Sequence, residues 1–407
     1  MKRLFKFIGV FVLTAAIIFS IIFLPNWNTF KTFFENREAM AEGSEWVDRT
    51  YSLAGLSQFI DEKPEHVSIA SLVKGHPDST ILFMEDVPRT MGTVSNFFLL
   101  VAAADLIDKG ELDADQTIKR SDISKYQLPD VYENVHRETF SNAISRGWID
   151  DGVLKLKHAL ELLAEFNDLA LADYVWWLIG EEYWNNFKER LNLAYTDLPL
   201  PFSGLYLATA PGIQNESQQE LISKYSADRA GFEEFVISES GSFNDYDAFR
   251  ESVIEKLKRN RLGSTFMEER DALAVFPKTT TSEMTSILMN LVNKELISPE
   301  ADEQILEWMR WPMKRQRPMT RNFTDYGAIF DNRMGLLNGI DFGTSEYTGD
   351  TTVQAVFFDK LPIGFWFHMS SNHMHQDFQQ RLIFDPAMIE RMKMIAGRHS
   401  ERNLVDE

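Results

Sequence analysis

The sequence predicts an α+β fold in which strands from both ends of the chain form one antiparallel sheet flanked by helices, with a mostly helical lobe inserted between them. A helix and two short strand patterns lie near the N-terminus, whereas further strand patterns and a last helix lie in the C-terminal third. Between these regions the apolar residues recur at helical spacing over a long stretch. Strands at the two ends and helices in the middle are the arrangement that such a fold needs.

The first 42 residues indicate a cytoplasmic tip, a transmembrane anchor helix and a linker. Met1 to Lys6 is basic and residues 7–24 carry no charge, a length at the lower end of what a membrane-spanning helix needs. The small residues of Ala39-Met-Ala41 leave a cleaved signal peptide as the alternative, but their distance from the apolar run favours an uncleaved anchor. With basic residues inside, we expect a bacterial inner-membrane protein whose main domain, 43–400, lies in the periplasm or outside the cell.

The first part of the sheet and a buried helix follow the linker. Apolar spacing predicts a helix over 45–61, and runs rich in Val, Ile and Phe predict strands over 66–73 and 80–85. Residues 94–108 are apolar on nearly every side, so we expect their helix to be buried in the middle of a domain.

Helical spacing then continues through the middle of the chain. It predicts one or two helices over 154–179 and another over 280–294, which opens with the capping sequence Thr280-x-x-Glu283. A last amphipathic helix starts at Asp385-Pro386. Three C-terminal runs predict strands: 327–337, 352–359 and 364–369.

These elements divide the main domain into two lobes. The α/β lobe consists of 43–92 and 310–400, and the helical lobe is 93–309. Within the helical lobe, 206–278 has mixed polarity and indicates an elaboration, and 401–407 is a tail.

Charge and composition exclude several classes of function. The chain has 41 basic and 61 acidic residues, a net charge of −20, which opposes nucleic-acid binding because phosphate neutralisation needs a basic face. It has no cysteine, so a disulfide framework, a thiolate nucleophile and a cysteine metal site are impossible. His373 and His375 form a pair without a further spaced set of ligands, so we expect no metal and no other cofactor.

Two stretches resemble the class A serine β-lactamases and the D-alanyl-D-alanine peptidases, a penicillin-binding-protein-like family. Met91 to Leu112 contains the predicted buried helix, closed by the polar turn Asp108-Lys109-Gly110. Thr280 to Met309 is similar to the family's paired helices after the active-site loop. The resemblance implies a β-lactamase/transpeptidase-like fold and serine hydrolase chemistry, which needs a hydroxyl and a neighbouring base.

By this resemblance the family's Ser-x-x-Lys motif falls on Thr93 and Asn96. Thr93 keeps a hydroxyl, but the Asn96 amide cannot take a proton as a lysine amine does. Two alternatives stay open. Thr93 is the N-cap of its helix, a position that threonine favours, or Ser95 is the nucleophile, although Phe98 stands where its lysine would be.

The family's Ser-Asp-Asn motif falls on Asn167-Asp168-Leu169, counted back from the end of the helix at Gly180. Asn167 stands at the proton-shuttle position but cannot shuttle a proton, and Leu169 cannot hydrogen-bond a substrate. Asp168 is retained and is a candidate substrate-binding residue. If the motif is instead aligned two residues earlier in the chain, Glu165 is a candidate base.

The family's Lys-Thr-Gly motif falls on Arg333-Met334-Gly335. The resemblance implies that Arg333 binds a substrate carboxylate, which its guanidinium can grip in bidentate fashion, and that Gly335 allows the backbone to approach the substrate. Met334 removes the hydroxyl. The alternative for Arg333 is an ion pair with one of the many surface acids of the chain.

Two functions remain compatible with these motifs. The first is a membrane-anchored serine hydrolase of weak or altered activity that acts on β-lactam or peptidoglycan-like amides or esters in the envelope. The second is a catalytically inactive binding module for a cell-wall peptide or a protein partner. Loss of base and shuttle together costs several orders of magnitude in rate, since each role is worth about 10² to 10⁴.

Overall fold

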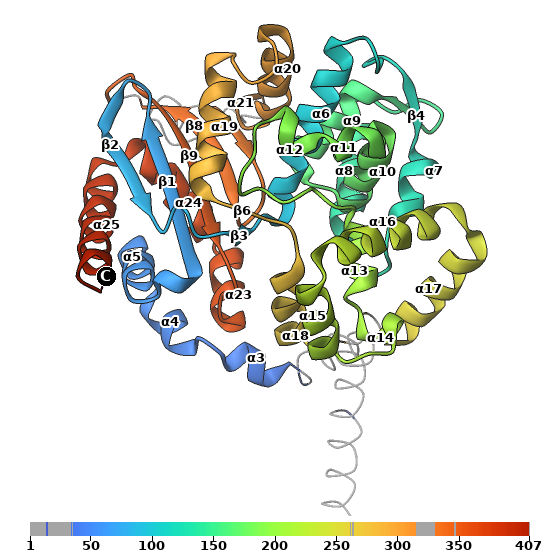
Figure 1. The fold of residues 1–407 in the computed structure, drawn as a ribbon, viewed down its shortest axis with the longest axis horizontal. Coiled ribbons are helices and arrows are strands. Elements are labelled where there is room, and N and C mark those ends of the chain that lie inside the picture. The colour runs from blue at the N-terminus through green and yellow to red at the C-terminus, as the bar shows by residue number, and fades with distance from the viewer. Residues whose placement is uncertain are drawn as a thin grey trace, which may run out of the picture.

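The computed structural model describes residues 36–260, 262, 264–314, 330–345 and 347–406, together with Thr14 and Phe34. Figure 1 shows a sheet with helices on both faces and, beside it, a lobe made almost entirely of helices. Apart from Thr14, the predicted anchor at 7–24 lies outside the described residues. Within the described ranges, no helix combines the length and the apolar character that crossing a membrane requires.

The main sheet has five strands, all paired antiparallel, in the order β2-β1-β9-β8-β7. Its strands are β1 (Val67–Val73), β2 (His76–Phe83), β7 (Asn332–Met334), β8 (Gly339–Thr344) and β9 (Thr351–Phe358). β1 pairs with β9 from Val67 opposite Phe358 to Val73 opposite Thr352. The predicted sheet built from both chain ends is therefore confirmed.

Helices from both chain ends cover the outer face of the sheet (Figure 1). They are α4 (Ser44–Arg49), α5 (Leu53–Glu62), α23 (Ile363–Ser371), α24 (Met374–Phe384) and α25 (Pro386–Asp406), and the short α3 (Arg37–Ala41) packs against α23 below them. Because side chains alternate along a strand, Val356 and Phe358 belong to this outer core, whereas Ala355 and Phe357 belong to the core shared with the helical lobe.

The helical lobe is built around α6 (Asn96–Asp108), in which every residue from Asn96 to Leu106 is buried. This confirms the prediction of a central buried helix.

Other elements before 206 are α7 (Arg120–Ile123), α8 (Glu133–Ser145), α9 (Leu156–Phe166), α10 (Leu169–Ile179), α11 (Glu181–Asn185), α12 (Phe187–Arg190) and α13 (Phe202–Ala208). After the elaboration come α19 (Thr281–Asn293), α20 (Pro299–Met309) and α21 (Trp311–Lys314). Two small sheets pair β3 (Arg89–Thr90) with β6 (Lys278–Thr279) and β4 (Thr117–Lys119) with β5 (Val153–Lys155).

The elaborated segment 206–278 is helical in its described part. It contains the end of α13 and then α14 (Pro211–Gln214), α15 (Gln218–Ala227), α16 (Arg229–Asp245), α17 (Asp247–Asn260) and α18 (Phe266–Ala272). A separate small core forms here from Leu207, Phe243, Val253 and Leu257. The segment therefore stabilises itself in part and extends the helical lobe.

The predicted strand over 364–369 is wrong, because these residues lie in α23. Both edges of β9 are already occupied by β1 and β8, so a strand following β9 finds no place beside it. Pro362 precedes the first turn of α23, and Gly364 lies so close to the backbone oxygens of Met40 and Glu42 that a Cβ would be 2.5 and 2.7 Å away. The strand missing from the sequence prediction is β8, whose glycines and buried Asp341 hide its pattern.

Candidate functional site

The first motif lies where a short 3-10 turn, η2 (Gly92–Ser95), leads into α6. Thr93 is half-buried inside this turn. The N-cap of η2 is Met91 and that of α6 is Ser95, and neither helix start has a side-chain cap hydrogen bond. The alternative in which Thr93 is an N-cap is therefore wrong. Ser95 is 6% exposed and its Oγ donates to the Gly92 carbonyl at 2.8 Å, so its hydroxyl is used locally.

The second motif meets the first through two amides. The Asn96 Nδ2 donates to the Asn167 Oδ1 at 3.5 Å, and both side chains are buried. Asn167 ends α9 in the left-handed region at φ 53°, a conformation that asparagine tolerates well. The positions that correspond to base and shuttle are thus adjacent, but neither amide can take up a proton.

Asp168 lies in the same loop and faces the opposite way. It is 1% exposed and is the N-cap of α10, where its Oδ1 accepts from the backbone N–H groups of Ala170 and Leu171. Its Oδ2 lies 2.8 Å from the Nδ1 of His136. These contacts give Asp168 a role inside the lobe, and its predicted contact with a substrate stays a prediction.

Glu165, the alternative base, points toward the end of α8. Its carboxylate accepts from the Arg146 guanidinium at 3.0 Å, and the side chain is 7% exposed. Burial raises the pKa of Glu165 to about 7, and the neighbouring Arg146 acts against this rise. A pKa near 7 suits a general base. The carboxylate, however, binds Arg146, which is not part of the Asn96–Asn167 contact.

The third motif touches the first through its backbone. Gly335 has φ 97°, and a Cβ at this position would lie 2.8 Å from the Val94 Cγ2. The Asn338 Nδ2 in the following turn donates to the Thr90 carbonyl at 2.8 Å. Only glycine fits this approach, because it combines a positive φ with no side chain. The third motif position is therefore beside the start of α6, as the resemblance implies.

Arg333 itself is buried within the sheet lobe. Its guanidinium donates to the Asp341 Oδ1 at 3.0 Å, the Gln379 Oε1 at 2.7 Å and the Leu336 carbonyl at 3.0 Å, and it is 2% exposed. Arg333 and Asp341 are opposite one another in the β7–β8 register. Burial raises the pKa of Asp341 and lowers that of Arg333, and each partner opposes the shift of the other. The structure therefore contains an ion pair, but its acid is the buried Asp341 and not a surface acid as the alternative expects.

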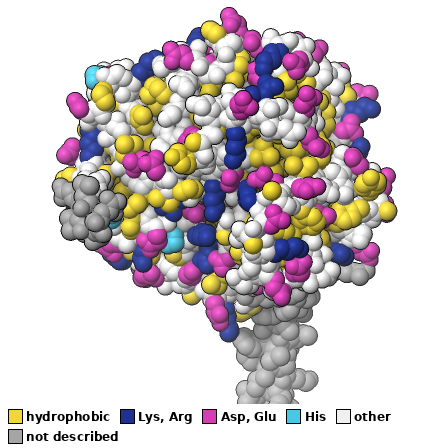
Figure 2. Space-filling model, in the orientation of Figure 1, with side chains coloured by type: hydrophobic (Ala, Val, Ile, Leu, Met, Phe, Trp, Pro, Cys, Tyr) yellow, Lys and Arg dark blue, Asp and Glu magenta, His cyan; other side chains and the backbone are white. Residues whose placement is uncertain are grey.

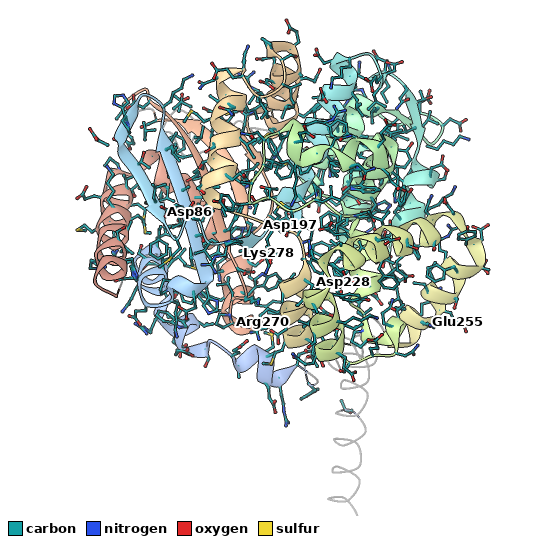
Figure 3. The ribbon with its side chains drawn as sticks, viewed as in Figure 1. Asp86, Asp197, Asp228, Glu255, Arg270 and Lys278 are labelled. Carbon is teal, nitrogen blue, oxygen red and sulfur yellow. The ribbon has the colours of Figure 1, made fainter. Side chains whose placement is uncertain are left out.

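The segment 193–201 joins the two lobes beside this site. The Glu283 carboxylate accepts from the Ala194 N–H at 2.7 Å and from the Thr196 hydroxyl at 2.5 Å. Of the predicted capping box of α19, the Thr280 half is confirmed, since the Thr280 Oγ1 accepts from the Glu283 N–H. The reciprocal half is wrong, because the Glu283 carboxylate binds the segment at 194–196 instead. Figure 3 shows Asp197 and Lys278 next to each other at this junction, where the Lys278 N–H donates to the Asp197 Oδ2 at 2.9 Å.

Lys and Arg side chains run down the middle of the face seen in Figure 2, along the junction of the lobes. Two arginines of this region are paired: Arg270 lies 2.5 Å from Glu42, and Arg229 lies 3.0 Å from Glu233 and 3.4 Å from Asp197. These ion pairs link the helical lobe to the N-terminal segment and to its own loops.

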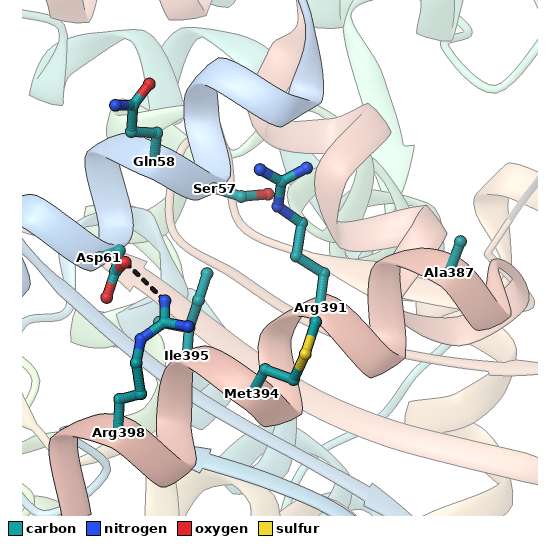
Figure 4. Close-up of a pocket in the computed structure, with 8 residues that line it drawn as sticks. All are labelled: Ser57, Gln58, Asp61, Ala387, Arg391, Met394, Ile395 and Arg398. Carbon is teal, nitrogen blue, oxygen red and sulfur yellow. Dashed lines mark hydrogen bonds and ion pairs between the residues drawn. The ribbon is translucent and has the colours of Figure 1, made fainter.

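A separate pocket lies between α5 and α25 on the outer side of the sheet lobe (Figure 4). It is lined by Ser57, Gln58, Asp61, Ala387, Arg391, Met394, Ile395 and Arg398. The Arg398 guanidinium crosses it to the Asp61 carboxylate at 2.6 Å. No residue of the three motifs lines it, so we do not assign the predicted chemistry to this pocket.

The structure thus brings part of the predicted site together. Thr93, Asn96, Asn167 and Gly335 gather around the start of α6, through the contacts of Asn96 with Asn167 and of Val94 with Gly335. The charged groups of Glu165, Asp168 and Arg333 are bound to other partners. Sequence reasoning missed Ser124 and His136, which join Asp168 across two other elements, because no local motif connects residues so far apart in the chain.

Comparison with known proteins finds similarity in solved structures only. The chain is similar to a β-lactamase from Sphaerobacter thermophilus (15% identity, TM-score 0.47, covering 80% of this chain and 94% of that one). It is also similar to a β-lactamase from Chitinophaga pinensis (13% identity, TM-score 0.45, covering 84% of this chain and 98% of that one). A third similar structure is a class A β-lactamase from Bacteroides cellulosilyticus (13% identity, TM-score 0.42, covering 80% of this chain and 96% of that one). No family model and no curated protein matches the chain. At these values the likeness carries no conclusion about activity, and the fold described above rests on this chain's own strand order and helix placement.

Proposed function

We propose that this chain is a β-lactamase-like protein whose site at the start of α6 binds a peptidoglycan-like peptide or a protein partner without forming an acyl-enzyme. The observation that carries the proposal is the buried contact between the Asn96 and Asn167 amides. A serine-type acyl transfer needs a group that accepts the proton of the attacking hydroxyl. Two amides at the base and shuttle positions cannot supply one.

Glu165, the alternative base, and Arg333, the candidate for carboxylate binding, support the same proposal. Glu165 is held by Arg146 at 3.0 Å, and Arg333 is held by Asp341 at 3.0 Å. Moving either group toward a ligand would leave a buried charge without its partner, which costs several kcal/mol. A site that keeps its shape but not its acid–base groups is suited to binding.

Incubation with a fluorescent penicillin, followed by intact-mass measurement, tests the proposal. We expect no covalent adduct on the folded protein, and the same result for Thr93→Ala. A stable adduct that is lost in Thr93→Ala would overturn the proposal and support a weak hydrolase with Thr93 as nucleophile. That second function is favoured by one observation, the half-buried Thr93 hydroxyl that is not used as a helix cap.

Binding itself is measured by calorimetric titration with a muropeptide that carries a tetrapeptide stem. We expect saturable binding that is abolished by Thr93→Arg, because the larger, charged side chain replaces the hydroxyl that would contact the ligand. The control is Ser145→Ala, an exposed position at the end of α8, which should bind like the wild type. Binding that is unchanged in Thr93→Arg would place the ligand elsewhere.

We also propose that residues 7–24 anchor the protein in the bacterial inner membrane with the main domain in the periplasm. The support is the uncharged run preceded by Lys2, Arg3 and Lys6. Protease added to spheroplasts should digest the main domain while a cytoplasmic marker survives. Protection of the main domain in intact spheroplasts would overturn the orientation.

A further inference from the structure

A second polar cluster lies in the helical lobe and joins three elements. Ser124 is the first residue of η3 (Ser124–Tyr126), His136 lies on α8, and Asp168 is the N-cap of α10. The Ser124 Oγ lies 3.0 Å from the His136 Nε2, and the His136 Nδ1 lies 2.8 Å from the Asp168 Oδ2. A hydroxyl, an imidazole and a carboxylate are thus connected in series.

The carboxylate fixes which imidazole nitrogen carries the proton. An ionised carboxylate only accepts hydrogen bonds, and the second oxygen of Asp168 already accepts from the N–H groups of Ala170 and Leu171 at 3.0 and 3.2 Å. The proton shared with Asp168 therefore lies on the His136 Nδ1. In the neutral imidazole the Nε2 is then unprotonated and accepts the hydrogen bond of the Ser124 hydroxyl. This is the tautomer that a general base for serine needs.

Exposure rises along the series from the acid to the hydroxyl. Asp168 is 1% exposed, His136 is 8% exposed, and Ser124 is half-buried. The Phe140 ring packs edge-on against the imidazole at a centroid distance of 4.9 Å, which limits its movement. The hydroxyl is therefore the member of the series that a molecule from solvent reaches first.

We propose that Ser124, His136 and Asp168 form a nucleophilic triad that hydrolyses small carboxylic esters, at a place separate from the site around Thr93. The Ser124 Oγ attacks the ester carbonyl carbon while the His136 Nε2 takes the hydroxyl proton. The ester C–O bond then breaks, and the leaving alcohol takes that proton. Water next attacks the acyl-Ser124, giving its proton to His136, and the released serine oxygen takes the proton back as the carboxylic acid leaves. Asp168 positions the imidazole and stabilises its charged form, and is a positioning residue.

A fluorophosphonate probe tests the triad in the full-length protein, because it reacts with activated serines by displacement of fluoride. We expect a single adduct by intact mass, lost in Ser124→Ala and in His136→Gln. The exposed control Ser145→Ala should label like the wild type. No adduct on the folded wild type, or an adduct that persists in Ser124→Ala, would overturn the proposal. The proposed function fails only on a penicillin adduct that is lost in Thr93→Ala, whereas the triad fails on fluorophosphonate labelling, so the two proposals fail independently.

Asp168→Asn separates positioning from folding. The asparagine Oδ1 can still cap α10, but its amide donates to the imidazole and moves the ring proton to Nε2, where it no longer accepts from Ser124. We expect the labelling rate to fall by at least about 100-fold, as for a wrong tautomer, while the circular dichroism spectrum is unchanged. Labelling at the wild-type rate in this variant would remove Asp168 from the triad.

Because the chain has no cysteine, a cysteine introduced at position 124 can report directly on its activation by His136. Ser124→Cys introduces the only thiol, and a neighbouring imidazole lowers the pKa of such a thiol and increases its thiolate fraction. We expect iodoacetamide to react at least about 10-fold faster at pH 7 with Ser124→Cys than with the exposed Ser145→Cys. The added change His136→Gln should abolish the difference. Equal rates for the two single variants would show that His136 does not activate position 124.

Discussion

The loop between α9 and α10 supplies two neighbouring residues to two polar clusters of different chemistry. Asn167 meets Asn96 at 3.5 Å beside Thr93, whereas Asp168 meets His136 at 2.8 Å in series with a serine. Two amides cannot pass a proton between them, but a carboxylate, an imidazole and a hydroxyl can. The place where a family resemblance predicts chemistry thus holds a pair of amides, and the next residue along the chain joins an imidazole and a hydroxyl. Position in a fold and chemical competence are separate properties.

The largest expected change in stability is at Arg333 of the third motif. This test shows whether Arg333 serves the fold or is a cation for ligand binding near Thr93. Arg333→Met leaves the Asp341 carboxylate buried without its partner. We expect the free energy of unfolding to fall by about 3–5 kcal/mol in urea titrations. The double variant Arg333→Met with Asp341→Leu should recover most of this loss. If the free energy of unfolding of the single variant falls by less than about 1 kcal/mol, the ion pair is not needed for the fold, and Arg333 would again be a candidate for ligand binding.

The two neighbouring loop residues offer the sharpest direct comparison. Asp168→Ala removes both the cap of α10 and the partner of the buried His136, so we expect a loss of about 2–3 kcal/mol in unfolding free energy. Asn167→Gly keeps the left-handed backbone at φ 53° and loses one long hydrogen bond, so we expect about 1 kcal/mol or less. Both are measured by urea unfolding. Equal losses would mean that the amide pair is as important to the fold as the Asp168 cluster.

The fold was largely accessible from the sequence because it depends on patterns of many residues. An apolar run on all sides predicts the buried α6, and strand patterns at both ends predict a sheet built from both ends of the chain, in which β1 is found to pair with β9. The aromatic run at 364–369 was mistaken for a strand, because its helix depends on the occupied edges of β9 and on a close contact of Gly364 with Met40.

The site was less accessible, because partners across space leave no local pattern. The motif positions of Asn96 and Asn167 could be counted along the chain, and they do meet. That Arg333 lies opposite Asp341 depends on the register of β7 with β8. That Ser124 reaches His136 and Asp168 depends on how η3, α8 and α10 pack.

A pH dependence sharpens the comparison at Glu165, the third acid near this loop. Burial raises its pKa to about 7 from 4.5, so the folded protein keeps a proton that the unfolded chain releases. Its contribution to stability is therefore fully present below pH 4.5 and is lost as pH rises through 7. In Glu165→Gln this loss is absent, and from pH 4.5 to pH 8 the unfolding free energy of the variant should gain about 2 kcal/mol on the wild type.

The exposed Glu133→Gln on α8 is the control and should follow the wild type at both pH values. Urea titrations at the two pH values give the difference directly. If Glu165→Gln runs parallel to the wild type, Arg146 keeps the carboxylate ionised in the folded protein. Glu165 would then be a fixed anion, like Asp168, and not a group with the pKa of a base.

The smallest expected effect is at Thr93, and it tests whether this residue has any structural duty. A threonine cap costs about 1 kcal/mol when replaced by alanine, but Thr93 lies inside η2 and makes no cap hydrogen bond. We therefore expect Thr93→Ala to change the unfolding free energy by less than about 0.5 kcal/mol, the range of surface substitutions. The matched comparison is Thr280→Ala, since Thr280 does cap α19 and should lose about 1 kcal/mol. If Thr93→Ala loses as much as Thr280→Ala, the hydroxyl serves the fold. A negligible loss would mean that the Thr93 hydroxyl has no structural role, as a ligand-binding function of this residue requires.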